Sequence, residues 1–131
     1  MTTKINMLAI DLAKGSFQVC AVTADGAVLY NRVLSRTRLT TLLAEHRACV
    51  VATEACATSH HWGRVAQEHG HEVRLVPAAY VKPFVKRQKN DRADAEAIAE
   101  AAMRPSMRFV AVKSAETQAR ASSIGLEPVA P

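Results

Sequence analysis

Two short, largely apolar runs that each end in a carboxylate constrain the fold of this 131-residue chain more than any other feature. Residues 5–10 lead into Asp11, and residues 49–53 lead into Glu54. Apolar runs of this length are typical of buried strands. A carboxylate that directly follows a buried strand costs free energy unless another group pairs with it. We therefore expect two strands whose ends carry Asp11 and Glu54 into a polar site.

The first third of the chain has the pattern of an antiparallel meander. Strands are predicted over residues 4–12, 17–22 and 28–33. The Asp25-Gly26 pair between the second and third strands is a strong signal for a two-residue hairpin. The chain is therefore expected to begin with three antiparallel strands.

The rest of the chain alternates between helical and strand patterns. The predicted elements are, in order, a helix over 38–46, a strand over 49–54, a helix that Ser59 caps and Gly70 ends, a strand over 72–76, a short helical piece near 78–87 that Pro83 interrupts, and a helix from Asp91 to about Met103. This order predicts an α/β fold with a mixed five-stranded sheet and helices on its faces. The handedness of crossovers puts the first strand in the centre, beside the fourth. Their neighbouring C-terminal ends would bring Asp11 and Glu54 together.

The last predicted helix adds two more carboxylates, Asp91 and Asp94. Aspartates in the first turn of a helix cap free N–H groups and interact favourably with the helix macrodipole, so capping is one interpretation. A helical wheel supports a second, compatible one, because both aspartates lie on the face expected to pack on the sheet. That face also contains Ala95, Ile98, Ala101 and Ala102, whereas Arg92, Glu96, Glu100 and Met103 lie on the opposite side.

Four carboxylates in one small space would repel one another and raise each other's pKa values unless cations neutralised them. Clustered carboxylate oxygens suit Mg²⁺ or Mn²⁺, which are hard ions that prefer carboxylates and water. The predicted cluster of Asp11, Glu54, Asp91 and Asp94 therefore points to metal-assisted phosphodiester chemistry.

Basic residues gather just before the acidic helix, and the chain carries a net charge of +5. Such residues either form a solvated basic loop or contact phosphates beside the metal site. The candidate phosphate-binding residues are Lys14, Lys82, Lys86, Arg87, Lys89 and Arg92.

Composition and termini bear on localisation. No apolar run reaches the roughly 18 residues of a membrane span, and no signal-peptide pattern opens the chain. We therefore expect a cytoplasmic protein with no membrane partner. Cys20, Cys49 and Cys56 are odd in number and lack paired spacing, which predicts reduced thiols. The adjacent His60 and His61 would point about 100° apart on a helix and are not expected to share a metal ion.

Three stretches together resemble the N-terminal domain of the DEDD transposases of bacterial insertion sequences, a group that includes the pilin-gene-inverting recombinases. The stretches are residues 8–14, 52–55 and 89–95. They place an aspartate, a glutamate and an Asp-x-x-Asp pair in the family's order, and the pair has the family's Asn-Asp-x-x-Asp-Ala context. The similarity covers about residues 5–119.

The resemblance implies a ribonuclease H-like (RuvC-like) fold over residues 1–112, with Asp11, Glu54, Asp91 and Asp94 as the catalytic, metal-binding tetrad. It further implies DNA strand cleavage and joining with Mg²⁺ or Mn²⁺, and a guide noncoding RNA that selects the DNA. Family members continue into a second domain that bears a catalytic serine. Here residues 113–131 look like a truncated or non-family tail, and residues from Ala119 onward show no helical periodicity. The expectation is therefore a truncated transposase domain that is not active alone.

Three alternatives remain open on the sequence. The chain could bind nucleic acid, or associate with itself or with a full-length transposase and interfere with it, without catalysis. It could be a compact nuclease of the Holliday-junction-resolvase kind. It could also be a fragment of an actin-like ATPase, although that class gives no reason for Asp91 and Asp94.

Overall fold

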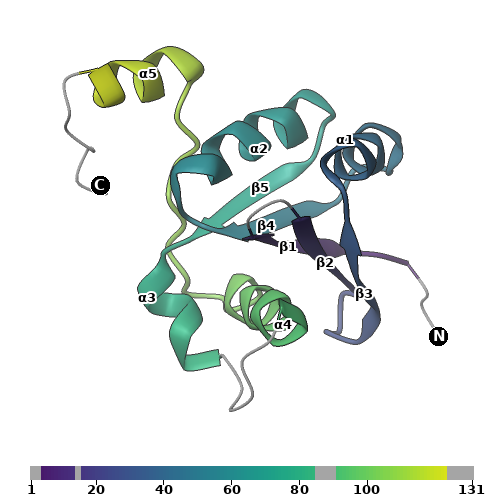
Figure 1. Cartoon of the computed structure of the whole chain (residues 1–131). Coiled ribbons are helices and arrows are strands. Elements are labelled where there is room, and N and C mark those ends of the chain that lie inside the picture. Colours follow the sequence, from purple (N-terminus) through teal and green to yellow (C-terminus); the bar gives the residue numbers. More distant parts are fainter. Residues whose placement is uncertain (1–3, 14–15, 85–90, 124–131) are drawn as a thin grey trace.

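A mixed five-stranded sheet forms the centre of the structure, a computed structural model that describes residues 4–13, 16–84 and 91–123 (Figure 1). The strands are β1 (Met7–Ala13), β2 (Ser16–Val22), β3 (Val28–Leu34), β4 (Val50–Glu54) and β5 (Glu72–Val76). Their order in the sheet is β3-β2-β1-β4-β5. The pairs β1–β2 and β2–β3 are antiparallel, whereas β1–β4 and β4–β5 are parallel. The predicted sheet is confirmed, with the first strand beside the fourth.

The helices divide between the two faces of the sheet. They are α1 (Arg36–Glu45), α2 (Ala57–Glu68), α3 (Ala78–Val81), α4 (Asp91–Ala102) and α5 (Ala115–Ser123), with a 3₁₀ turn, η1, at Lys82–Phe84. In Figure 1, α1 and α2 lie on one side of the sheet, and α3 and α4 lie on the other. None of the helices in the described ranges has the length and apolarity that crossing a bilayer requires.

The side chains of each strand point alternately to the two faces of the sheet, and each face has its own apolar core. In β1, Met7 and Ala9 pack with α4, while Leu8 and Ile10 pack with residues of α1 and α2. Successive side chains of a strand point to opposite faces, so the almost continuous apolar run in β1 indicates a strand covered on both sides. The opening apolar run thus places Asp11 near the C-terminal end of a strand that is buried from both faces.

Helix α2 begins earlier than predicted. Its N-cap is Cys56, and Ser59 is the third residue of the helix, so the prediction that Ser59 caps it was wrong. The Ser59 hydroxyl instead accepts a hydrogen bond of 2.9 Å from the Cys56 backbone N–H. This reach back from the third helical position satisfies an N–H group at the start of the helix. The single Trp62 packs edge-on against Phe17, with 5.1 Å between ring centroids, and belongs to the core.

The segment after α4 returns along the sheet before it forms α5. Val110 makes an isolated antiparallel bridge with Leu75 of β5. Arg64 of α2 then donates hydrogen bonds to the Lys113 carbonyl at 2.6 Å and to the Gln118 side chain at 3.0 Å. Helix α5 continues to Ser123, so the segment without expected helical periodicity is helical at its start.

The three thiols differ in exposure and are all free, as predicted for reduced cysteines. Cys20 is buried in β2, Cys49 is half-buried just before β4, and Cys56 is exposed. Burial raises the pKa of both Cys20 and Cys49 to about 11, and the negative charge of Glu96 adds to the effect at Cys20.

Candidate active site at the strand ends

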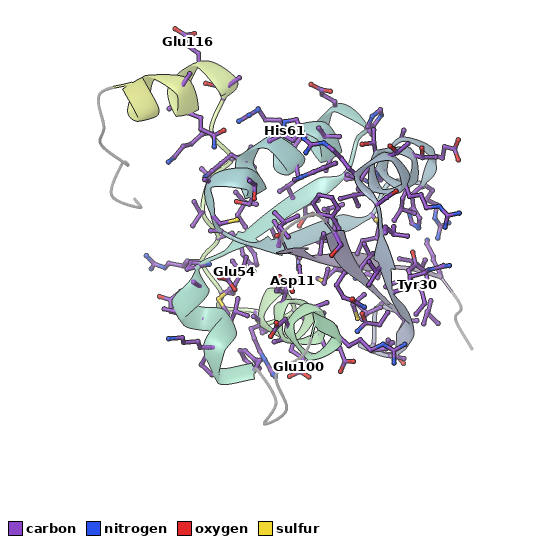
Figure 2. The ribbon with its side chains drawn as sticks, viewed as in Figure 1. Asp11, Tyr30, Glu54, His61, Glu100 and Glu116 are labelled. Atoms are coloured by element: carbon purple, nitrogen blue, oxygen red, sulfur yellow. The ribbon has the colours of Figure 1, made fainter. Side chains whose placement is uncertain are left out.

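Asp11 and Glu54 lie next to each other where the pairing of two parallel strands ends, Asp11 near the end of β1 and Glu54 at the end of β4. The register pairs Ala9 with Ala52 and Ile10 with Thr53, and the next residues in the two strands are Asp11 and Glu54. Ala9 and Ala52 belong to the core beneath α4. Because side chains alternate, Asp11 and Glu54 point to that same face. Figure 2 shows both on the α4 side of the sheet, and both are half-buried.

Helix α4 carries the other two carboxylates across this face. Asp94 is half-buried, and Asp91 is the first residue of the helix, although its side chain lies outside the described part of the chain. The predicted apolar face is confirmed, and it is wider than the wheel suggested. The buried residues of α4 are Ala93, Ala95, Ala97, Ile98, Ala99, Ala101 and Ala102.

Small side chains explain why α4 can approach the sheet so closely. Almost every buried position of the helix is alanine, so its backbone comes near β1 and β2, which it contacts most. Glu100 is exposed and points away from the sheet in Figure 2, as predicted. The same prediction was wrong for Met103, which is half-buried, packs against the core beneath α4 and reaches Gly26.

A series of hydrogen bonds that joins β2, β3 and α4 holds the first part of α4 in place. The Gln18 side-chain amide donates a 2.7 Å hydrogen bond to the side-chain oxygen Oδ1 of Asn31. The Asn31 amide in turn donates to the Arg92 backbone carbonyl at 3.0 Å and to the Glu96 carboxylate at 3.3 Å. Gln18 is buried and lies directly opposite Asp11 in the β1–β2 pair. These residues therefore connect the position of α4 to the strand that carries Asp11.

Sequence reasoning missed Gln18 and Asn31, although a signal was present. Gln18 interrupts an otherwise apolar strand, and a buried amide needs hydrogen-bond partners. The sequence did not identify Asn31 as the partner of Gln18, because Asn31 lies on another strand and contacts a helix that is far along the chain.

The other end of α4 is held by Arg74 of β5. Its guanidinium donates a 2.9 Å hydrogen bond to the carbonyl of Ala102, the last residue of the helix. A cation at a helix C-terminus satisfies a free carbonyl and complements the macrodipole. Arg74 also forms a 2.8 Å ion pair with Glu72. Helix α4 is thus attached at both ends to strands on opposite sides of β1.

Two of the site's carboxylates lack a side-chain partner among the described residues. Within the part of the chain that the structure describes, the carboxylates of Glu54 and Asp94 receive no hydrogen bond or ion pair from another side chain. Half-buried carboxylates without such partners have oxygens available for a hard cation. The residues described, which do not include the Asp91 side chain, contain no group of three histidine, cysteine or acidic residues placed to hold a metal ion.

The structure describes two of the six basic residues predicted to contact phosphate. Lys82 opens η1 and Arg92 lies in the first turn of α4, and both are exposed. Lys14, Lys86, Arg87 and Lys89 lie outside the described residues. The adjacent histidines have separate roles: His60 is buried and accepts a 3.1 Å hydrogen bond from the Lys113 backbone, while His61 packs against Trp62.

The sheet order, with carboxylates at two neighbouring parallel strand ends and on the helix that crosses them, defines an α/β domain of the ribonuclease H-like class. Comparison with known protein families is more specific. The family model of the IS110-type DEDD transposases, described as a transposase, matches residues 8–121. The chain belongs to this transposase family.

Curated relatives agree with the family. The "Probable family 20 transposase" of Pseudomonas aeruginosa is 48% identical over 115 residues, which cover 88% of this chain and 34% of that protein. The transposase for insertion sequence element IS1328 of Yersinia enterocolitica is 43% identical over 88% of this chain and 34% of its own length. The transposase for insertion sequence element IS1111A of Coxiella burnetii is 43% identical over 87% and 31%. The chain spans about a third of the length of these relatives.

Proposed function

We propose that this chain is the metal-dependent nuclease domain of an insertion-sequence transposase, and that it acts in DNA strand cleavage and joining. The observation that carries the proposal is the placement of Asp11 and Glu54 side by side, on the sheet face covered by the helix that bears Asp91 and Asp94. Relatives of this chain are named as transposases for insertion sequence elements. DNA is therefore the proposed substrate.

The proposed ligands of Mg²⁺ or Mn²⁺ are Asp11, Glu54, Asp91 and Asp94. Their donor chemistry fits these ions, because all four offer carboxylate oxygens. When bound, such an ion stabilises the charge that develops on a phosphate during strand cleavage and activates the attacking nucleophile. The protein's own part is to hold the carboxylates at fixed positions. The strand register positions Asp11 and Glu54, and the contacts of Asn31 and Arg74 position α4.

A calorimetric titration with Mn²⁺ tests the proposed metal centre. We expect saturable binding to the native chain, and a loss of at least about tenfold in affinity in Asp11→Asn and in Asp94→Asn, because each removes a charged ligand. Glu100→Gln is the matched control, since it removes an exposed carboxylate from the same helix. Equal binding in all three variants, or no saturable binding to the native chain, would count against the site.

Activity is tested separately with supercoiled plasmid and a four-way DNA junction. The proposal expects nicking that requires Mn²⁺ or Mg²⁺ and that Asp94→Asn abolishes. DNA binding without metal-dependent cleavage, in a chain that binds Mn²⁺, would favour the non-catalytic alternative of a nucleic-acid-binding module. Cleavage confined to the four-way junction would favour the resolvase alternative.

A further inference from the structure

A cleft outside the carboxylate site combines two arginines with an exposed aromatic ring. It has a volume of about 400 Å³ and is lined by Tyr80 of α3 and by Arg104, Pro105, Ser106, Met107 and Arg108, which follow α4. This volume lies within the roughly 300–1,000 Å³ that is usual for small-ligand sites. In Figure 1, the segment that leaves α4 passes beside α3 on its way to α5.

Topology places this cleft toward the same edge of the sheet as the carboxylates. Helix α3 follows directly after Val76, the residue of β5 that pairs with Glu54. Val110 bridges Leu75 in the antiparallel sense, so the residues just before Val110 lie toward the C-terminal end of β5. Arg108 therefore lies toward the end of the sheet at which Glu54 is found.

The arginines of the cleft carry uncompensated positive charge. Both are exposed, and within the described residues neither forms an ion pair with a carboxylate. The Arg104 guanidinium lies over the Phe84 ring, 4.9 Å from its centroid, which fixes its direction without neutralising it. A guanidinium presents a planar set of N–H donors that matches the oxygens of a phosphate.

The apolar part of the cleft suits a flat ring. Tyr80 has 48% of its surface exposed, although large aromatic side chains are usually buried to a greater extent. Met107 is half-buried beside it in the same cleft. Nucleic-acid bases stack on exposed aromatic side chains independently of sequence, provided that the base is unpaired. An aromatic ring next to two unpaired guanidinium groups therefore matches one nucleotide, with its base on the ring and its phosphate on the arginines.

We infer that this cleft binds an unpaired nucleotide of a nucleic-acid strand, with its base on Tyr80 and a neighbouring phosphate on Arg104 and Arg108. This inference deepens the proposed function and rests on it in one respect: the bound strand would be part of the nucleic acid on which the carboxylate site acts. The ligand chemistry, a base with its phosphate, is common to single-stranded DNA and RNA, and the experiment distinguishes these two sources.

Fluorescence anisotropy measures binding of the full chain to a short fluorescein-labelled oligonucleotide, as single-stranded DNA and as RNA of the same sequence, in EDTA. We expect Arg108→Ala to weaken binding about tenfold and to reduce the salt dependence by about one phosphate contact. The matched control is Arg38→Ala, an exposed arginine of α1 on the other face of the sheet. Tyr80→Ala should weaken binding by about five- to hundredfold, and Tyr80→Phe should bind as the native chain does.

Each outcome decides the inference. Equal losses in Arg108→Ala and Arg38→Ala would overturn it, because binding would then follow net charge alone. Equal affinities of Tyr80→Ala and Tyr80→Phe, a duplex that competes as well as the single strand, or no binding of either oligonucleotide would also overturn it. Tighter binding of one oligonucleotide supports the cleft and identifies its source as DNA or RNA. The assay needs no metal, and Arg108→Ala should titrate with Mn²⁺ as the native chain does, so failure here is distinct from failure of the metal centre.

Discussion

At the residue scale, Thr53 is in an unfavourable environment immediately before Glu54. Its hydroxyl is buried and finds no hydrogen-bond partner among the described residues. An unsatisfied buried hydroxyl costs on the order of 1–3 kcal/mol. Thr23, which is also buried, shows the contrast, because its hydroxyl donates to Asp25 and accepts a 3.0 Å hydrogen bond from the Ala27 backbone.

Replacement of each threonine by valine should therefore have effects of opposite sign. Thr53→Val removes an unsatisfied oxygen from the core, and we expect it to raise the free energy of unfolding by about 1 kcal/mol. Thr23→Val leaves the Ala27 N–H without its acceptor, and we expect it to lower the free energy of unfolding by about 1–3 kcal/mol. Urea denaturation followed by Trp62 fluorescence measures both. A destabilised Thr53→Val variant would show that the hydroxyl has a stabilising partner in solution.

At the scale of the element, α4 determines how much of the site is assembled. Its N-terminal part is attached through Asn31 and its last carbonyl through Arg74, while the alanines between them pack closely on β1 and β2. Asp94 lies between these two attachments, so Asn31 and Arg74 help to determine where Asp94 lies relative to the sheet. Neutral amides such as Asn31 can in this way act as positioning residues.

Asn31→Ala should loosen the first turns of α4 without unfolding the domain. The variant loses the Asn31 hydrogen bonds to Arg92 and Glu96 and leaves the buried Gln18 amide without its partner, at a cost of about 1–3 kcal/mol. We expect faster amide hydrogen exchange in the N-terminal half of α4 and weaker Mn²⁺ binding. Val33→Ala is the control, since Val33 is 57% exposed on the same strand. Unchanged exchange in α4 would show that alanine packing alone fixes the helix.

The elements were largely predictable from the sequence because their signals are local. Apolar runs, a hairpin near Asp25-Gly26 and the helical spacing of α4 depend on neighbouring residues, and all three are found in the structure. The prediction of a two-residue turn was wrong, because the loop contains Ala24, Asp25 and Gly26 and is closed by the hydrogen bond from the Thr23 N–H to the Ala27 carbonyl. Predictions failed where a distant contact decided the outcome. Met103 packs inward because the hairpin at Gly26 lies within its reach, and no periodicity within α4 contains that information.

The candidate site was predictable to a similar extent. Crossover handedness and the position of the two residues at neighbouring strand ends predicted Asp11 beside Glu54, and the register agrees. The residues that hold α4 come from β2, β3 and β5, and their pairing depends on how the helix lies across the sheet. The cleft at Tyr80 was also missed, because its lining comes from α3 and from a loop after α4.

At the scale of the whole molecule, the two apolar cores are joined through one sheet. Leu8 and Ile10 face the core of α1 and α2, while the neighbouring Met7 and Ala9 face α4. Loss of packing on either face should thus disturb the same strands, and unfolding should be cooperative across both layers.

Ile98→Ala tests this cooperativity. The substitution leaves a cavity beneath α4 and should lower the free energy of unfolding by about 2–5 kcal/mol. Trp62 lies in the core of the opposite face and is the only tryptophan of the chain. Its fluorescence should report the same shifted urea midpoint as far-UV circular dichroism. A Trp62 transition that stays at the native midpoint while the dichroism shifts would show that the two layers unfold independently.

The two edge strands of the sheet, β3 and β5, differ in how much of their outer side is paired, because the chain returns past β5 at Val110. The bridge to Leu75 occupies part of the outer side of β5, whereas the described residues place nothing along the outer side of β3. Strand β3 also exposes Val28, Leu29 and Val33. Unpaired strand edges accept further strands, and among the described residues β3 offers the longer unpaired edge for a sixth strand. A strand added at β3 would not contact β4, which carries Glu54. It would lie beside the strand whose Asn31 side chain is hydrogen-bonded to α4.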